Sequence, residues 1–301
     1  MKKLLPLILP LAITITAFTA TSKHPEVAPP SSDLRQKFEL SEHYQKALVI
    51  EGFPIVASKK VNDASLYEAA FVIRQMLKNR DDILRKLGEN KIRLSIMATD
   101  ERTTDVPEHS DLSPPEYWNR RSRGLGATRT RPSVSCGEEN LIHNEGDPYA
   151  TESIMVHEFA HAIHLMAVND LDPTFDQRLE ETYRQAMAHG LWENKYASQN
   201  SREYFAEGVQ SWFDTNREPD HDHNHVNTRS ELIAYDPGLS KIVEEVFGEN
   251  DWRYVRSDDP SRANEPHLKL LERSKLPSFQ WTKEEIEAYE KVSEGGKLKS
   301  E

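Results

Sequence analysis

Cysteine is almost absent from this 301-residue sequence, which contains only Cys136. An internal disulfide is therefore excluded, and stability has to come from a hydrophobic core, which a chain of this length can build. Basic residues are also in deficit, because 38 Lys and Arg against 50 Asp and Glu give a net charge of -12. This acidity makes the protein a poor candidate for binding nucleic acid or anionic membranes.

Long apolar runs are missing except at the start of the sequence. Lys2 and Lys3 precede an apolar run over residues 4–20, and small residues follow in Ala20-Thr21-Ser22. This order is typical of a secretory signal peptide, here residues 1–22. The run is shorter than the roughly 20 apolar residues of a spanning helix, and no later stretch could cross a bilayer. We expect a secreted protein, extracellular or periplasmic, with no membrane span after signal removal.

Glycine is sparse as well, and Gly124 and Gly126 do not form a phosphate-binding loop, because the third glycine and the following Lys-Ser/Thr are missing. Five arginines surround these glycines: Arg120, Arg121, Arg123, Arg129 and Arg131. Such a cluster could receive acidic substrate side chains or a carboxylate. The alternative, and the commoner use of such clusters, is a solvated, salt-bridged loop.

What the sequence does contain is an H-E-x-x-H motif, His157, Glu158 and His161, within the apolar and glycine-free stretch Ile154–Met166. Positions four apart share one face of a helix, so both imidazoles can point at a single ion, for which zinc is the best candidate. Glu158 faces the same cavity and can take a proton from the water that zinc activates. A helix with a merely solvated polar stripe is the alternative, but its apolar flanks make uncompensated polar residues costly.

A catalytic zinc usually has three protein ligands, so a third is needed. We favour Glu203, because Glu207 lies one helical turn beyond it and can accept the second ring N–H of a zinc-bound histidine. Glu181 is the less favoured candidate, since Gln185 at the same spacing is a weaker acceptor. One catalytic zinc ion is thus predicted.

The residues His157-Glu158-Phe159-Ala160-His161, Tyr196 and the segment Glu203–Glu207, which reads E-Y-F-A-E, resemble a known family. They are similar to the zincin domain of anthrax lethal factor and of the secreted Pro-Pro endopeptidases. The resemblance covers roughly residues 154–213 and implies that Glu203 is the third ligand. It also implies that Tyr196 donates its hydroxyl to the oxyanion or to the departing amine. A half-buried core tyrosine is the alternative for Tyr196.

The same resemblance implies a zincin-like α+β fold, with a small twisted sheet packed on the active-site helix and a largely helical C-terminal half. We expect residues 23–40 to be a linker or short pro-segment and residues 41–260 to be a single catalytic domain. Residues 261–301 would form an extension with one short helix near Lys283–Val292 and a charged tail. The strand predicted at Ile92–Ala98 would hold an extended peptide by its backbone.

Three local features complete the predictions. Asp147-Pro148 is expected to start the active-site helix about two turns before His157. Cys136 either reaches the metal as an inhibitory thiolate or is a small buried residue. The alternating histidines of His221–His225 form either a second metal site or a solvated loop.

Together these observations predict an exported zinc metallopeptidase, an endopeptidase that acts on polypeptides with Glu158 as general base. Two alternatives stay open: a zinc hydrolase of a non-peptide amide, as in a cell wall, and a zincin-fold surface binding module without turnover.

Overall fold

The computed structural model describes residues 26–269 and 271–294. The predicted signal peptide, residues 1–22, and the last seven residues of the predicted tail lie outside this range. Among the described residues, no helix is both long enough and apolar enough to cross a membrane.

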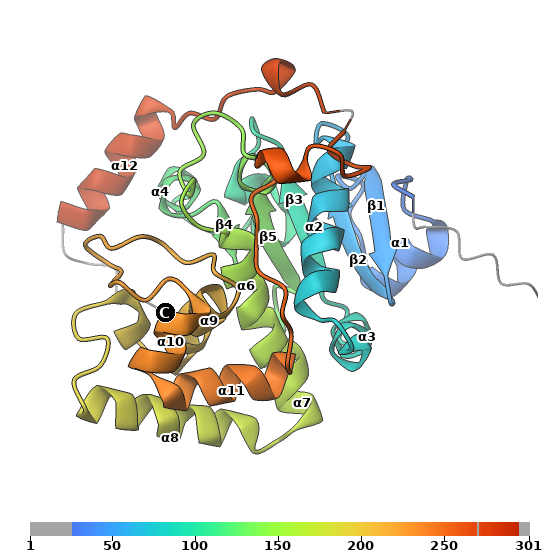
Figure 1. The fold of residues 1–301 in the computed structure, drawn as a ribbon. Coiled ribbons are helices and arrows are strands. Elements are labelled where there is room, and N and C mark those ends of the chain that lie inside the picture. Colours follow the sequence, from blue (N-terminus) through green and yellow to red (C-terminus); the bar gives the residue numbers. More distant parts are fainter. Residues whose placement is uncertain (1–25, 270, 295–301) are drawn as a thin grey trace, which may run out of the picture.

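The centre of the fold is a five-stranded sheet with the strand order β1-β2-β3-β5-β4 (Figure 1). Its strands are β1 (Lys46–Ile50), β2 (Phe53–Ala57), β3 (Arg93–Met97), β4 (Gly124–Leu125) and β5 (Ser133–Gly137). The three inner strands β2, β3 and β5 are parallel, whereas the edge strands β1 and β4 each run antiparallel to their neighbour.

A tight hairpin joins β1 to β2. Glu51 and Gly52 both have positive φ angles, 48° and 84°, as a two-residue hairpin turn requires. Helix α3 (Asp81–Glu89) presses against this turn, because a Cβ added to Gly88 would stand 2.4 Å from the carbonyl oxygen of Gly52. Gly88 lies within this helix, at the point of contact.

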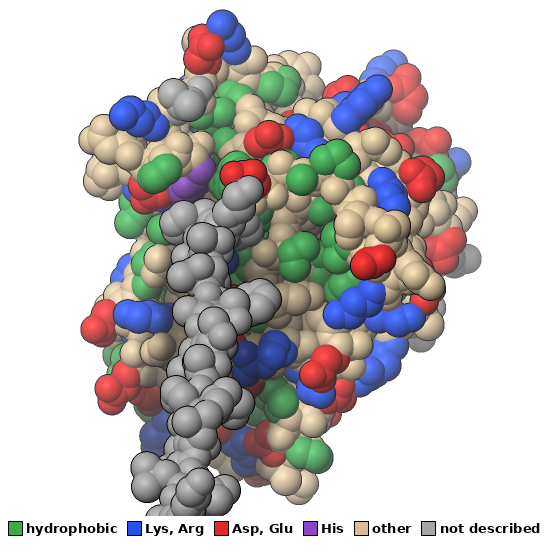
Figure 2. All heavy atoms as spheres, turned by 90° about the vertical axis from the view of Figure 1, so that its right-hand side faces the viewer, with side chains coloured by type: hydrophobic (Ala, Val, Ile, Leu, Met, Phe, Trp, Pro, Cys, Tyr) green, Lys and Arg blue, Asp and Glu red, His purple; other side chains and the backbone are tan. Residues whose placement is uncertain are grey.

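One face of the sheet carries the main core. Helices α2 (Asp63–Met76), α3 and α6 (Ile154–Ile163) pack against it, with buried residues such as Ile55, Ile96 and Phe159 in one cluster. The opposite face is covered by α1 (Ser32–Phe38), whose Phe38 packs with Val56 in a small second cluster. The face that bears α1 and β1 shows acidic and basic side chains interspersed (Figure 2).

The C-terminal half is mostly helical, and α9 packs directly on α6. Its longer helices are α8 (Phe175–Ala188), α9 (Ser201–Trp212), α10 (Arg229–Tyr235), α11 (Pro237–Phe247) and α12 (Lys283–Glu294). The remaining α-helices of the described residues are α4 (Pro115–Arg121), α5 (Glu138–Ile142) and α7 (Asn169–Leu171). The predicted α+β class, with a small sheet against the H-E-x-x-H helix, is confirmed.

The start of the active-site helix was predicted wrongly. Helix α6 begins at Ile154, where Ser153 is the N-cap and its Oγ accepts a hydrogen bond from the Val156 N–H at 3.4 Å. Asp147 instead accepts from the Tyr149 N–H at 2.9 Å, in a local turn. The Asp-Pro pair therefore forms an Asx-type turn rather than a helix cap.

The segments on either side of the predicted domain are packed against it. Ala28 forms a β-bridge with Ala47, and Phe38 and Leu40 are buried, so residues 26–40 are not a free linker. Their removal as a pro-segment stays a prediction. In the predicted C-terminal extension, Phe279 is buried and α12 packs on α4.

The strand predicted to bind a peptide is not available for that purpose. Strand β3 lies between β2 and β5, so both of its edges already pair with other strands. The edge strand beside α6 is β4, which the sequence did not reveal. Its two residues are too few to give a periodic signal.

Candidate metal centre

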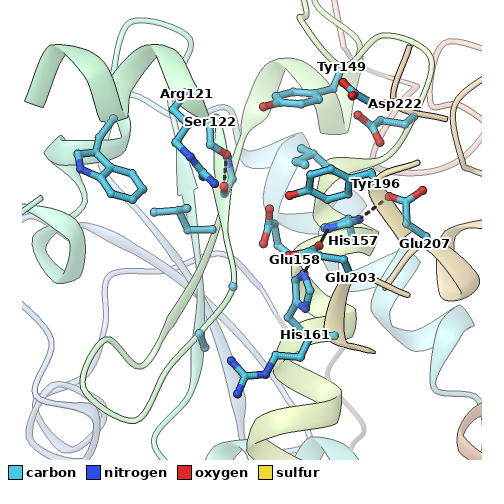
Figure 3. Close-up of a pocket in the computed structure, with 18 of the residues that line it drawn as sticks. Arg121, Ser122, Tyr149, His157, Glu158, His161, Tyr196, Glu203, Glu207 and Asp222 are labelled. Atoms are coloured by element: carbon cyan, nitrogen blue, oxygen red, sulfur yellow. Dashed lines mark hydrogen bonds and ion pairs between the residues drawn. The ribbon is translucent and has the colours of Figure 1, made fainter. Parts of the chain in front are cut away.

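Three predicted ligands converge between two helices. His157 and His161 are one turn apart on α6, and Glu203 lies in the first turn of α9. Asn200 fixes that turn, because its side chain accepts hydrogen bonds from the N–H groups of Arg202 and Glu203, both at 3.0 Å. The cap therefore sets where α9 begins and presents Glu203 to the two imidazoles (Figure 3).

The three donor atoms lie at nearly equal separations. Glu203 Oε2 is 3.1 Å from His157 Nε2 and 3.2 Å from His161 Nε2, and the two Nε2 atoms are 3.2 Å apart. Zinc bonds of about 2.0–2.1 Å at tetrahedral angles place donor atoms about 3.3–3.4 Å apart. Two imidazoles and one carboxylate are also a zinc donor set. The residues present therefore fit a zinc ion.

The second ring nitrogen of His157 has two neighbours. Its Nδ1 lies 2.7 Å from Gln210 Oε1 and 3.5 Å from Glu207 Oε1. Glu207, the predicted orienting residue, is thus near but is not the hydrogen-bond acceptor, and it accepts instead from Asn216 Nδ2 at 3.0 Å. Gln210 was missed. Its position seven residues after Glu203, on the same face of the helix, was the available signal.

Gln210 is itself held in place. Its Nε2 donates to Glu152 Oε2 at 3.0 Å, and Glu152 pairs with Arg217 at 2.5 Å. The amide oxygen of Gln210 is therefore directed at His157, which keeps the proton of that imidazole on Nδ1 and leaves Nε2 free as a donor to a metal.

Glu158 lies between α6 and the edge strand. A Cβ added to Gly124 would stand 3.0 Å from Glu158 Cγ, and one added to Gly126 would stand 3.5 Å from Glu158 Oε2. The glycines thus allow β4 to approach the carboxylate closely. Burial raises the pKa of Glu158, and the nearby His157 and His161 act against that rise. A carboxyl group with a raised pKa is better matched to proton transfer near neutral pH.

Tyr196 lies in the 3₁₀ turn Tyr196–Ser198 that precedes α9. Its ring centroid is 6.0 Å from that of His157 and 6.4 Å from that of His223, with which it stacks. Burial raises the pKa of Tyr196, so its hydroxyl stays protonated and can donate a hydrogen bond. Figure 3 shows the ring beside His157 and Glu203.

The alternative ligands lie elsewhere. Glu181, on α8, pairs with Arg184 at 2.7 Å and is not brought to the imidazoles. A further histidine just after α6, His164, is fully buried and contacts Asp176 at 2.9 Å. Cys136 is fully buried in β5 and burial raises the pKa of its thiol, so it is a small core residue and not a thiolate ligand.

The run His221–His225 does not assemble three metal ligands in the described part of the chain. His223 instead contacts Asp220 at 2.8 Å, and the Asp222 carbonyl accepts a hydrogen bond from the Tyr196 N–H at 2.8 Å. This loop therefore helps to hold Tyr196 in place.

The ligands open into a cleft of about 1190 Å³. Helices α6 and α9 form one wall, and α4, β4 and residues of α12 contribute to the other. Figure 3 shows Arg121 and Ser122 across the cavity from His157 and Tyr196. The C-terminal extension thus takes part in the cleft, through Trp281 and Tyr289.

The five clustered arginines separate into two groups. Three have carboxylate partners: Arg123 with the buried Glu139, Arg129 with Asp170 and Arg131 with Asp111. The other two, Arg120 and Arg121, line the cleft without such a partner among the described residues. The interpretation as a salt-bridged loop therefore applies to three members of the cluster.

A family model described as anthrax toxin lethal factor, N- and C-terminal domain, matches residues 61–223. The chain belongs to this family. The match runs from just before α2 to beyond α9 and includes all three ligands that converge in the cleft, and the predicted resemblance is confirmed. At the level of the family, membership supports a protease.

Among solved structures, the Pro-Pro endopeptidase PPEP-2 from Paenibacillus alvei is a distant neighbour of this lethal factor family member. The two chains share 16% sequence identity over 65% of this chain and 96% of that chain, with a TM-score of 0.36. No curated protein sequence matches.

Proposed function

We propose that this member of the lethal factor family is an exported zinc-dependent endopeptidase, with the metal held by His157, His161 and Glu203. The observation that carries the proposal is the convergence of their three donor atoms, 3.1 to 3.2 Å apart, at the base of an open cleft. A bound zinc ion would polarise the substrate carbonyl and make water more acidic. Export rests on the predicted signal peptide.

The protein's own groups would then move the protons. Glu158 accepts a proton from the attacking water and passes it to the leaving nitrogen, and the raised pKa of its buried carboxyl makes it a stronger base for the first of these transfers. The protonated hydroxyl of Tyr196 donates a hydrogen bond to the oxygen on which negative charge develops. Gln210 keeps His157 in the tautomer that a metal requires.

The substrate is a polypeptide in an extended conformation. Strand β4 is the edge strand next to Glu158, and an extended peptide can add to such an edge through main-chain hydrogen bonds. The glycines at positions 124 and 126 let this segment lie directly against Glu158 and His161 of α6.

A mixed peptide library tests the proposal. Purified protein loaded with zinc is incubated with the library, and products are identified by mass spectrometry. We expect cleavage by the wild type and by Glu181→Gln, whose carboxylate lies outside the site. We expect no cleavage by Glu158→Gln, although this variant should retain its zinc.

A wild type that holds one zinc and cleaves no peptide would contradict the proposal. In that case the site would serve a non-peptide amide or a binding function. Equal cleavage by wild type and Glu158→Gln would instead show that Glu158 is not the base.

A further inference from the structure

Two arginines on the wall opposite the ligands have aromatic neighbours in place of carboxylates. The guanidinium of Arg121, the last residue of α4, lies 5.3 Å from the ring centroid of Trp118. That of Arg120 lies 4.9 Å from the ring of Trp281 and 5.1 Å from the ring of Tyr289. A guanidinium stacked on a ring keeps its N–H edge available for a further partner.

This arrangement is informative because the chain is rich in acidic residues. With 50 acidic and 38 basic residues, a carboxylate partner is easily found, and the neighbouring Arg129 and Arg131 each have one at 2.8 Å. Arg120 and Arg121 have none within the described residues, although they belong to the same segment. Their charge is directed at the cleft and not at another part of the protein.

Arg121 is also close to the reacting groups. Its side chain lines the same cleft as Glu158 and Tyr196. Figure 3 shows Arg121 exposed on the cavity wall that faces them. Whatever binds beside the scissile bond therefore lies in the field of this guanidinium.

We infer that Arg121, with Arg120 behind it, selects peptides that carry a carboxylate near the scissile bond. This inference rests on the proposed function and names its substrate class. A guanidinium binds a carboxylate through two parallel N–H···O hydrogen bonds, which a glutamine or asparagine amide cannot match. Because Arg121 lines the same cleft as Glu158 and Tyr196, the carboxylate that it binds belongs to the part of the substrate that lies in the cleft with the scissile bond.

The other wall does not cancel this preference. Glu152 lines the cleft, but its carboxylate is neutralised by Arg217 at 2.5 Å. Asp222 also lines it, and this carboxylate would repel an acidic residue placed on its side. Arg202, on α9, also lines the cleft, so the charge of this wall is mixed, whereas the α4 wall presents the basic pair Arg120 and Arg121.

The test compares wild type with Arg121→Gln, Arg121→Glu and the matched control Arg129→Gln, whose side chain is exposed and paired with Asp170 outside the cleft. Cleavage sites from the mixed library should be enriched in Asp and Glu for the wild type and the control. Arg121→Gln should lose this enrichment, and Arg121→Glu should shift it towards Lys and Arg. All four proteins should bind one zinc.

A cleaved peptide is then resynthesised with Glu or Gln at the enriched position, and with a free or amidated C-terminus. We expect KM of the wild type to rise about tenfold on the Glu-to-Gln change, with little change in kcat, and Arg121→Gln to treat both peptides alike. An equivalent effect of C-terminal amidation would identify the chain terminus as the carboxylate that is recognised.

Two kinetic outcomes would overturn the inference. In the first, neither the Glu-to-Gln change nor C-terminal amidation of the peptide alters the kinetics of the wild type. In the second, Arg121→Gln loses kcat equally for the Glu and Gln peptides.

If no peptide is cleaved, the proposed function fails, and calorimetry still decides the role of Arg121. A nonapeptide of alternating alanine and glutamate should then bind the zinc-loaded wild type more tightly than Arg121→Gln does. Its glutamine counterpart should bind both equally, and equal binding of the glutamate peptide to both proteins would contradict the inference.

Discussion

Two clusters in the described part of the chain have ligand-type side chains close together, and they differ in one respect. His157, His161 and Glu203 form the first, and Glu68, Glu265 and His267 form the second, with all ligand atoms of each within 4.8 Å. In the first cluster, none of the three side chains has an ion pair with an arginine or lysine of the described residues. The second cluster surrounds the guanidinium of Arg262, which bonds Glu68 at 2.7 and 2.8 Å and Glu265 at 2.7 and 2.9 Å.

The presence or absence of an arginine side chain inside the cluster decides whether the cluster can bind a metal ion. In the second, the arginine fork already occupies the carboxylate oxygens and balances their charge, so an ion would have to displace it. In the first, the corresponding position is open to the cleft. The second cluster therefore ties α2 to the C-terminal extension, through Glu68 and Arg262, and the first is the candidate metal centre. Proximity of histidine and glutamate alone does not distinguish the two.

The largest expected effect is on zinc content. His161→Ala should weaken zinc binding by more than about 100-fold, beyond what outer neighbours of a site contribute, because a direct ligand is lost. His267→Ala should retain one equivalent of zinc per chain. Elemental analysis of both proteins after dialysis measures the zinc content. A second zinc in the wild type that disappears in His267→Ala would show that the second cluster also binds metal.

The next effect is on stability. Arg262→Met should lower the free energy of unfolding by about 3–5 kcal/mol, because Glu68 is left buried with His267 as its one remaining partner among the described residues. Urea denaturation in the presence of chelator measures this. Arg184→Met, which removes an exposed ion pair with Glu181, is the matched control and should cost less than about 1 kcal/mol.

The same variant sharpens the comparison in a second way. Without its arginine, the cluster of Glu68, Glu265 and His267 has the donor set of a metal site. Zinc should therefore bind to this cluster in Arg262→Met and raise the Tm of that variant. In the wild type, where Arg262 occupies the cluster, zinc should not bind there. An Arg262→Met protein as stable as the control would show that the buried ion pair does not hold the extension.

The metal centre was largely predictable because its signals are local. His157 and His161 share a helix face by their spacing, and the four-residue step from Glu203 to Glu207 marked α9 in the same way. The ion network was not predictable, because Glu68 and Arg262 are 194 residues apart and no periodicity links them. Strands β4 and β5 were missed for a related reason: they are short, contain glycine and serine, and form only by pairing within the sheet.

A third prediction concerns how the first cluster is supported. Gln210→Met should weaken zinc binding about 10- to 100-fold, because His157 Nδ1 loses its acceptor at 2.7 Å. Glu207→Gln should have a smaller effect, since Glu207 is 3.5 Å from that nitrogen. Competition with a chelator of known affinity measures both, and a larger effect of Glu207→Gln would assign the orienting role to Glu207, as the sequence first indicated.

The smallest effect is a dependence of stability on pH in the second cluster. The hydrogen bond from Arg262 lowers the pKa of Glu265 below its ordinary 4.5, although burial acts against it. A carboxyl group whose pKa is lower in the folded state stabilises the fold above about pH 4.5, and this contribution is lost as pH falls through the folded value. Glu265→Gln should therefore be less stable than wild type at pH 7, by about 1 kcal/mol or less, because the group is partly exposed.

Urea denaturation of both proteins from about pH 7 down to about pH 4 should show the difference shrinking below pH 4.5. A difference that stays constant over this range would mean that Glu265 acts through its shape or its neutral hydrogen bonds. The charge of Arg262 would then be balanced by Glu68 alone. Glu265 would in that case have an uncommitted carboxylate, and the exclusion of a metal from the second cluster would rest on the bonds that Arg262 and His267 form with Glu68.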